Sequence, residues 1–505
     1  MSSSRTKKSI RNIVYGFFNQ LVMLILGFIS RMIFLKYLNE SYLGINSLFT
    51  EILSMLSLAD LGLTTVMVYT FYKPLANNDK KKLSALLNFY KTLYKTIAIV
   101  VTVIGFILIP FLRYIVNTNE KIDHLYLYYI LFLLKTVISY LFVYKVSILN
   151  ADQNNYLVSK ISTNTRVLTV LLQIIVLCFT KNYTLYLVVD IFTTWLNNYW
   201  CAKIVDKRYP YLKGNFEISK NEKRDIFKNV GSGFLYKLSS VLLNSTDNTL
   251  ISIILSTEVV GLYSNYGLLF SRLSMFINIL FSSLSGSIGN LIATEDRQHR
   301  YRVFNIIQSI GFLISSITSV CCFLLINDFI SIWLGSKFVF GVDVQIACVF
   351  NYYFSISLQP LWIYRDATGL YKQTKYVMIC TAIVNLVLSI ILGYQYGLFG
   401  IIVASIISRI CTYFWYEPIL LYKQFFEKKV TSYFIKHLYN FAVTLITMLF
   451  GLVMFKHVYV TNIFFFFGKV VFVLIYSVAA IYLFYFWRKD YKNLINYFKS
   501  KLIKK

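Results

Sequence analysis

The sequence predicts an all-helical integral membrane protein with about 14 transmembrane helices, and three observations support this fold class. Of its 505 residues, 57% are hydrophobic and 14% are charged, which is more apolar surface than a water-soluble domain can bury. Apolar runs near the ~20 residues that cross a bilayer follow one another along the chain, separated by short polar breaks. The seven cysteines lie inside these runs without Cys-x-x-Cys spacing, as expected of reduced core residues. A sizeable soluble domain is therefore excluded.

The apolar runs also define the expected organisation of the chain. The approximate span cores are 13–36, 42–72, 85–116, 124–150, 156–180, 182–205, 226–254, 258–291, 303–326, 342–366, 374–394, 396–425, 432–456 and 462–487. The longest polar connection, 206–224, holds a proline, a glycine and many charges, and it follows the sixth span. We expect four parts: an N-terminal lobe at 1–205, a cytoplasmic connection at 206–224, a C-terminal lobe at 225–425, and an extra helix pair with a basic tail at 426–505.

The formal net charge of +28 is distributed unevenly along the chain. Alternate polar breaks collect most of these cations, while the opposite loops hold roughly one each. Because cytoplasmic loops carry the excess of Lys and Arg, we expect both termini in the cytoplasm and the chain in an inner or plasma membrane. A nucleic-acid partner is not expected, since the charge follows the topology.

A short pattern recurs in the two halves of the chain. Tyr42-Leu43-Gly44-Ile45 opens the second expected span, and Val260-Gly261-Leu262-Tyr263 opens the eighth. Each is followed by Leu-Ser-Met, starting at Leu53 and at Leu273. This echo favours two related halves, and paired halves that enclose a midplane site are common in secondary transporters.

Several short phrases, spread over nearly the whole chain, carry a family resemblance. They are Ser9-Ile10-Arg11-Asn12, Phe28-Ile29-Ser30-Arg31, Tyr42-Leu43-Gly44-Ile45-Asn46, Leu58-Ala59-Asp60-Leu61-Gly62, Tyr72-Lys73-Pro74-Leu75-Ala76-Asn77-Asn78-Asp79, Leu243-Asn244-Ser245-Thr246-Asp247-Asn248, Gly261-Leu262-Tyr263-Ser264-Asn265-Tyr266 and Gly397-Leu398-Phe399-Gly400. With these phrases the chain resembles the Wzx-type oligosaccharide flippases, the polysaccharide transporter branch of the multidrug/oligosaccharidyl-lipid/polysaccharide (MOP) exporter superfamily. None is a catalytic motif, so the resemblance bears on fold and class more than on substrate.

The resemblance implies two six-helix lobes around a central cavity that opens alternately to each side, with an extra C-terminal helix pair. It implies a flippase rather than an enzyme, moving undecaprenyl-pyrophosphate-linked oligosaccharide repeat units from the cytoplasmic to the outer leaflet for surface, capsular or exopolysaccharide assembly. The implied partners are this lipid-linked oligosaccharide and membrane lipids, with a polysaccharide polymerase and a chain-length regulator as further candidates.

Some Lys and Arg residues lie inside the expected spans and need a reason to be there. Each costs about 2.5–3.5 kcal/mol at mid-bilayer, so about six facing lipid would exceed the roughly 5–15 kcal/mol of a typical net stability. Helical spacing places these cations on polar helix faces. Arg166, for example, shares a face with Ser162 and Gln173. A surplus of buried positive charge suits a pyrophosphate. The candidate substrate-binding residues are Arg31, Lys135, Arg166, Lys237 and Arg272.

Each of these cations has a structural interpretation as well, as a snorkelling side chain or a member of an interhelical ion pair. The acidic residues Glu51, Asp60 and Asp247 also have two interpretations. They can couple transport to a proton or sodium ion, or they can join helices by pairing. The four histidines fall near span ends, so neither a metal site nor a cofactor is expected.

Three alternative functions remain at this stage. A polysaccharide polymerase or glycosyltransferase needs large extracytoplasmic loops, and the longest one expected, near 327–342, is short for that role. A drug or cation antiporter of the same superfamily should have a cavity of carboxylates and apolar groups, which the cationic faces oppose. A lipid II-type flippase also carries a pyrophosphate substrate, and the residues leave it open.

Overall fold

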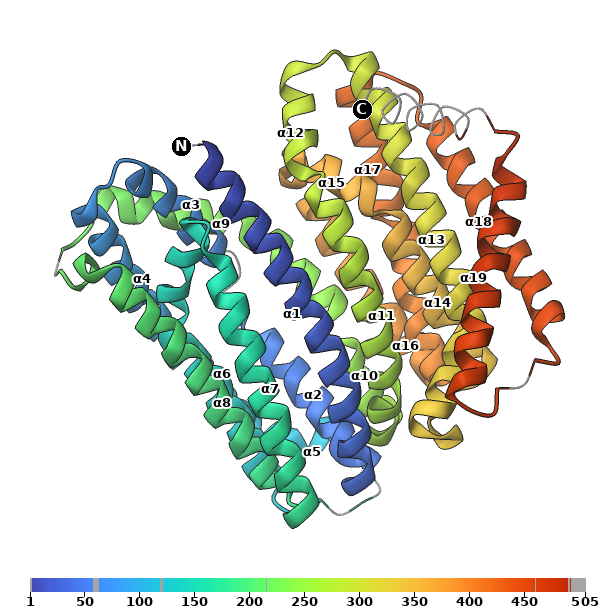
Figure 1. Ribbon diagram of the computed structural model, residues 1–505, viewed down its shortest axis with the longest axis horizontal. Helices are drawn as coiled ribbons and strands as arrows, with labels where there is room; N and C mark the ends of the chain where they lie inside the picture. Colours follow the sequence, from blue (N-terminus) through green and yellow to red (C-terminus); the bar gives the residue numbers. More distant parts are fainter. Residues whose placement is uncertain are drawn as a thin grey trace. The chain divides into compact units, whose positions relative to one another are not determined.

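The computed structural model describes residues 2–57, 63–118, 120, 122–214, 216–458, 460–488 and 491, and these form helices and short connections without any strand. The chain divides into two compact units, Met1–Gly261 and Leu262–Lys505. Figure 1 shows each unit as a bundle of long helices that lie side by side. The predicted all-helical class is confirmed. The lobe boundary expected at 206–224 stays a prediction, although α9 and α10 group with the helices before them.

The helices of the first unit are α1 (Ser2–Tyr37), α2 (Glu40–Leu56), α3 (Leu63–Ala76), α4 (Lys80–Leu108), α5 (Leu112–Ile115), α6 (Leu125–Ala151), α7 (Asn155–Thr180), α8 (Tyr183–Arg208), α9 (Lys220–Asn244) and α10 (Asp247–Ile254). Polar residues in the breaks cap the N-termini of several helices. The side chains of Asn39, Asp79 and Asn182 each accept a hydrogen bond from the backbone N–H three residues later. Helix α1 packs on α7, α7 on α8, and α8 on α6.

The helices of the second unit are α11 (Thr257–Ser283, whose first turn belongs to the first unit), α12 (Ser285–Thr294), α13 (Arg297–Leu334), α14 (Val342–Ser357), α15 (Gln359–Ala367), α16 (Tyr371–Cys411), α17 (Tyr413–Leu421), α18 (Thr431–Phe455) and α19 (Ile463–Tyr485). Helix α13 is the centre of this bundle, because α14, α18 and α19 all pack against it. The predicted C-terminal helix pair corresponds to α18 and α19.

Nine helical stretches within the described residues are long and apolar enough to cross a membrane. They are Val14–Tyr37, Lys80–Ile115, Leu125–Ala151, Asn155–Thr180, Thr257–Ile292, Arg297–Leu334, Gln373–Phe426, Thr431–Phe455 and Ile463–Tyr485. The predicted spans 42–72, 182–205, 226–254 and 342–366 are not among these nine stretches. The span 42–72 includes residues outside the described ones, and α8, at 182–205, is one helix that carries Asp190, Asn197 and Asn198. Helix breaks at Ser245–Thr246 and at Leu358 divide the other two. The count of about fourteen stays a prediction.

The stretch Gln373–Phe426 contains two of the predicted spans, 374–394 and 396–425. Its 54 residues would make a helix of about 80 Å, well beyond the ~30 Å bilayer core. Gly397 breaks it with φ 61° and ψ −140°, a conformation that glycine adopts readily. Asn385 Nδ2 lies 3.0 Å from Ser405 Oγ, and a Cβ on Gly400 would overlap the carbonyl oxygen of Leu392. The chain therefore folds back at Gly397 into two antiparallel helices.

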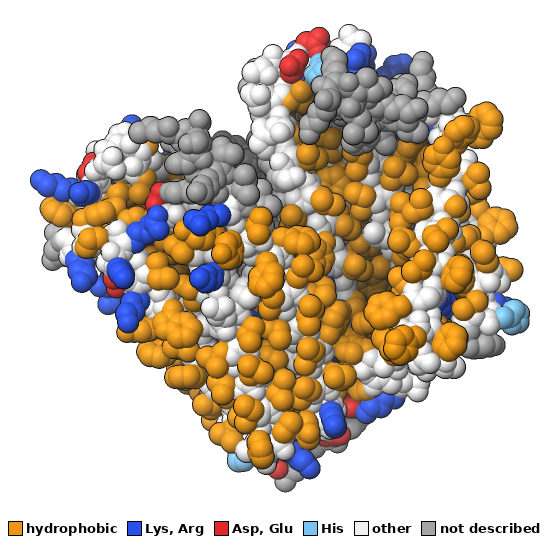
Figure 2. All heavy atoms as spheres, viewed as in Figure 1, with side chains coloured by type: hydrophobic (Ala, Val, Ile, Leu, Met, Phe, Trp, Pro, Cys, Tyr) orange, Lys and Arg blue, Asp and Glu red, His pale blue; other side chains and the backbone are white. Residues whose placement is uncertain are grey.

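The outer surfaces of both units are apolar. Figure 2 shows hydrophobic side chains over the helices of the face drawn, with Lys and Arg side chains gathered near helix ends. Helix α19 is typical, because Phe464 is 83% and Phe472 68% exposed. Exposed apolar surface on this scale would aggregate in water, and it is suited to lipid. The chain is therefore a multi-pass membrane protein; the inner membrane and the cytoplasmic termini stay predictions.

The two copies of the recurring sequence pattern touch each other at the starts of α2 and α11. A Cβ on Gly44 would overlap the backbone carbonyl oxygen of Thr257, and one on Gly261 would overlap that of Glu40. Each glycine thus faces the residue four positions before the other glycine. Ser41 Oγ also donates to Glu258 Oε1 at 3.1 Å, and these residues are equivalent in the two copies. The crossing has a local two-fold relation, as expected of related halves.

The 206–224 connection is attached to the first unit along α4. Ser84 Oγ and Asn88 Nδ2 donate to the carbonyl oxygen of Gly214 at 2.6 and 2.9 Å. Lys82 pairs with Glu222 at the start of α9, and this hydrogen bond lowers the pKa of the Glu222 carboxyl. The described part of the expected connection at 206–224 is thus packed onto the first unit.

Topology gives a first test. Helix α4 separates Asn78 at one end from Asp123, before α6, at the other, by about 40 Å of helix. On a cysteine-free background, we expect Asn78→Cys and Ser219→Cys to resist a membrane-impermeant thiol reagent in intact cells, and Asp123→Cys to react. The opposite pattern would reverse the orientation of the chain.

Buried polar contacts attach the C-terminal helix pair to the second unit. Asn440 on α18 accepts from Ser316 on α13 at 2.9 Å, donates to Tyr353 on α14 at 2.6 Å, and also contacts the Tyr485 hydroxyl of α19. Asn440 is fully buried. One side chain therefore links four helices.

We expect Asn440→Leu to lower the free energy of unfolding by about 1–3 kcal/mol, because it leaves buried hydroxyls without their partner. Thermal unfolding in detergent measures this, with Lys456→Ala at the exposed end of α18 as the control. Equal unfolding temperatures for both variants would show that Asn440 does not hold the helix pair.

Candidate functional site

The structure distributes the five candidate cations over both units. Arg31 lies on α1, Lys135 on α6 and Arg166 on α7, all in the first unit, while Arg272 is half-buried on α11 in the second. The side chain of Lys237 on α9 lies outside the described residues. The first three cations can therefore be assessed as one site, and Arg272 only within its own unit.

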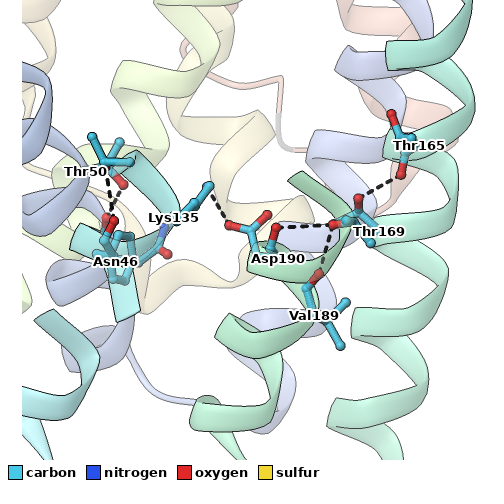
Figure 3. A network of polar contacts seen from close by, with 10 residues as sticks. Asn46, Thr50, Lys135, Thr165, Thr169, Val189 and Asp190 are labelled. Atoms are coloured by element: carbon cyan, nitrogen blue, oxygen red, sulfur yellow. Dashed lines mark hydrogen bonds and ion pairs between the residues drawn. The ribbon is translucent and has the colours of Figure 1, made fainter. Parts of the chain in front are cut away.

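Arg31, Lys135 and Arg166 lie on helices that pack around α8, since α6 and α7 contact α8 and α1 contacts α7. The charges of Arg31, Arg166 and Asp190 all act on the Tyr186 hydroxyl of α8. Lys135 Nζ lies 2.5 Å from Asp190 Oδ2, and Figure 3 shows these two side chains pointing toward each other. Among the described side chains, this cationic cluster contains the three cations Arg31, Lys135 and Arg166 together with the carboxylate of Asp190.

Regular helix geometry builds the cluster. Tyr186 and Asp190 are one turn apart on α8, so both face the same neighbours. Thr163 on α7 donates to Asn19 on α1 at 2.7 Å, and Thr165 on α7 donates to Asn197 on α8 at 2.9 Å. These bonds fix the register of the helices that carry the arginines.

A small cavity lined by several hydroxyl-bearing residues lies beside Lys135. Its volume is about 250 Å³, and α2, α6 and α8 contribute its walls. Figure 3 places Thr50 and Asn46 of α2 on one side of Lys135 and the α7 threonines Thr165 and Thr169 on the other, beyond Asp190. The ion pair thus lies within a band of polar side chains that crosses the first unit.

The acidic candidates form a separate site. Glu51 Oε1 on α2 accepts the backbone N–H of Asn248 at 3.0 Å, and the charge of Asp247 acts on Glu51. Asp60 lies outside the described residues. Two carboxylates this close in an apolar setting favour sharing a proton or binding a cation between them. Their proximity was not evident from the sequence, because they are almost two hundred residues apart.

The structure adds detail at residues that the sequence indicates only in outline. His437 lies in the second turn of α18, near the end of a predicted span, and it is 2% exposed, with Nε2 3.2 Å from Ser357 Oγ. Tyr186 was not singled out, although its one-turn spacing from Asp190 was a usable signal. The pairing of Lys135 with Asp190 matches the ion-pair interpretation that stood beside the substrate-binding one. The role of Lys135 in substrate binding stays a prediction.

Comparison with known proteins identifies the fold. No protein-family model matches the chain, and no curated protein does. The solved structure of the lipid II flippase MurJ in its inward closed conformation aligns with a TM-score of 0.69 at 16% identity, covering 94% of this chain and 99% of its own. A mutant of the Vibrio cholerae MATE transporter VcmN gives 0.54 at 12%, covering 85% and 98%.

An inward-facing multidrug resistance MATE family transporter of the MOP superfamily gives a TM-score of 0.54 at 13% identity, covering 78% of this chain and 93% of its own. These neighbours are transporters and flippases rather than enzymes, and they cover between 78% and 94% of this chain. The chain therefore has the fold shared by the MurJ flippase and the MATE transporters of the MOP superfamily.

Proposed function

We propose that this protein is a Wzx-type flippase. It moves undecaprenyl-pyrophosphate-linked oligosaccharide repeat units from the cytoplasmic to the outer leaflet by alternating access, for assembly of a surface polysaccharide. The observation that carries the proposal is the cationic cluster of Arg31, Lys135 and Arg166, held inside a membrane-embedded bundle. The MurJ-like fold supports a flippase, since that protein is described as a lipid II flippase.

The proposed role of the cluster follows from the chemistry of a pyrophosphate. Removing its charge from water is tolerable only against fixed opposite charge. An arginine offers a planar fork that binds a phosphate by two parallel hydrogen bonds, and a lysine offers a point charge. The charges of Arg31 and Arg166 both act on the Tyr186 hydroxyl, and both are proposed to contact one bound pyrophosphate. Lys237 and Arg272 are proposed as further cavity residues.

Glu51 and Asp247 are proposed to couple transport to the movement of a proton or a sodium ion. Taking up a proton or a sodium ion there would remove a like-charge repulsion between α2 and the start of α10. Such a change favours one arrangement of these two helices over another, which is what coupling requires. Asp60 remains a third candidate for this role.

A lipid II flippase is the second candidate, favoured by the alignment with MurJ over 94% of the chain. Its substrate shares the pyrophosphate but differs in the attached sugar and peptide. A drug antiporter fits less well, because a cationic cluster repels the cationic drugs that such a protein exports.

Deletion in the native host separates these functions. We expect surface polysaccharide to disappear and lipid-linked repeat units to accumulate on the cytoplasmic leaflet, while growth and peptidoglycan synthesis continue. Translocated but unpolymerised units would indicate a polymerase, and arrested peptidoglycan synthesis a lipid II flippase. Re-expression of the intact gene is the control.

A further inference from the structure

The cavity beside Lys135 has an unusual lining. Six hydroxyl side chains surround it, together with one lysine and two apolar side chains: Thr50, Ser54, Ser57, Thr136, Ser139, Thr194, Lys135, Leu53 and Phe132. Its volume of about 250 Å³ is below the ~300–1,000 Å³ of pockets that enclose drug-sized ligands. It can therefore enclose one ring of a larger substrate, but not a whole oligosaccharide.

Most of these hydroxyl groups already use their protons. Five of them donate to backbone carbonyl oxygens of their own helices, at distances from 2.6 to 3.0 Å: Thr50 to Asn46, Ser54 to Glu51, Ser57 to Leu53, Thr136 to Phe132 and Ser139 to Thr136. A hydroxyl has one proton and two acceptor lone pairs. What remains for a ligand in the cavity is thus mainly a set of acceptors.

Charge narrows the ligand further. A metal cation or ammonium group would meet the Lys135 ammonium, which repels it. An anion would need donors, and the hydroxyl protons are engaged with the backbone, while the charge of Lys135 is already balanced by Asp190 at 2.5 Å. A neutral ligand that carries many O–H or N–H donors satisfies both conditions. Leu53 and Phe132 provide apolar contact for the C–H face of such a ligand.

We propose that this cavity is a sugar subsite, which holds one hydroxyl-bearing ring of the transported glycolipid. Ring hydroxyls donate to the lining hydroxyl oxygens, and Lys135 donates to a ring oxygen while it stays paired with Asp190. The inference rests on the proposed function and deepens it. Within the cationic cluster it narrows the role of Lys135 to contact with the sugar, and it leaves the pyrophosphate to Arg31 and Arg166.

The test compares two probes in proteoliposomes: the lipid-linked oligosaccharide and the same polyprenyl pyrophosphate without sugar. The double variant Ser54→Ala/Thr136→Val removes two acceptors with little change in volume. The preference for the glycosylated probe is the ratio of the two kcat/KM values. We expect this ratio to fall about tenfold, because KM rises for the glycosylated probe. The matched control is Thr102→Val on α4, whose hydroxyl makes the same bond to the carbonyl four residues earlier, at 2.7 Å, but does not line the cavity.

Each other outcome overturns the subsite. An unchanged preference would mean that the cavity holds only water, and an equal loss for both probes, with a lower unfolding temperature, would mean that the hydroxyls are structural. These results would leave the proposed function intact, because the wild-type protein would still move the glycolipid. If the wild-type protein moves neither probe, the function and the subsite fail together.

Discussion

Replacing Gly44 or Gly261 by alanine is expected to destabilise the protein strongly, although alanine is the better helix former. In an ordinary helix position this change gains about 0.5–1 kcal/mol. Here the new Cβ overlaps a backbone carbonyl oxygen of the crossing helix, which cannot move aside as a flexible side chain can. We expect a net loss of about 1–3 kcal/mol for each single variant. Thermal unfolding in detergent measures it.

The two-fold relation at the crossing sharpens this prediction. Because both glycines lie in one contact, separating the helices to accept one Cβ makes room for the other. Gly44→Ala/Gly261→Ala should therefore cost less than the sum of the single variants, with a coupling of about 0.5–3 kcal/mol. The control is Gly16→Ala on α1, where a Cβ meets nothing within 4 Å and stability should be kept or raised. Additive losses, or losses as small as for Gly16, would contradict the crossing.

Much of this fold is visible in the sequence because bilayer helices have a simple signature. Length and hydropathy alone place most of the helices, including both arms of the hairpin at Gly397. The breaks inside 226–254 and 342–366 were missed, since Ser245–Thr246 and Leu358 interrupt helices without interrupting the apolar run. Hydropathy does not detect such breaks, because they depend on local backbone geometry.

For the candidate site, the sequence indicates which side chains lie on polar helix faces, but not which of them pair. The polar faces that carry Arg31, Lys135 and Arg166 follow from helical spacing, because a lipid-facing arginine is too costly. Spacing along one helix does not determine the register between helices. From the sequence, Asp190 is therefore only one of several acidic residues that could pair with Lys135. The approach of Glu51 to Asp247, two like charges, is the reverse of what pairing rules favour.

Removing both arginines of the cationic cluster is expected to abolish transport. Each charge-assisted hydrogen bond to a phosphate contributes about 1.5–3 kcal/mol in a water-excluded site, so each loss lowers the rate roughly tenfold to a hundredfold. Arg31→Ala/Arg166→Ala should therefore show no measurable movement of lipid-linked oligosaccharide in proteoliposomes. Arg166→Lys keeps the charge and loses the planar fork, so it should retain part of the activity.

The arginine result must be separated from simple loss of structure. Lys91→Ala removes one positive charge from an exposed position on α4 and should leave transport unchanged. Amounts of inserted protein and unfolding temperatures must match across the variants. Lys237→Ala and Arg272→Ala test the two remaining cations in the same assay. If the double arginine variant is abundant, stable and still moves the glycolipid at the wild-type rate, the arginines serve only to join α1 and α7 to α8, and the pyrophosphate binds elsewhere.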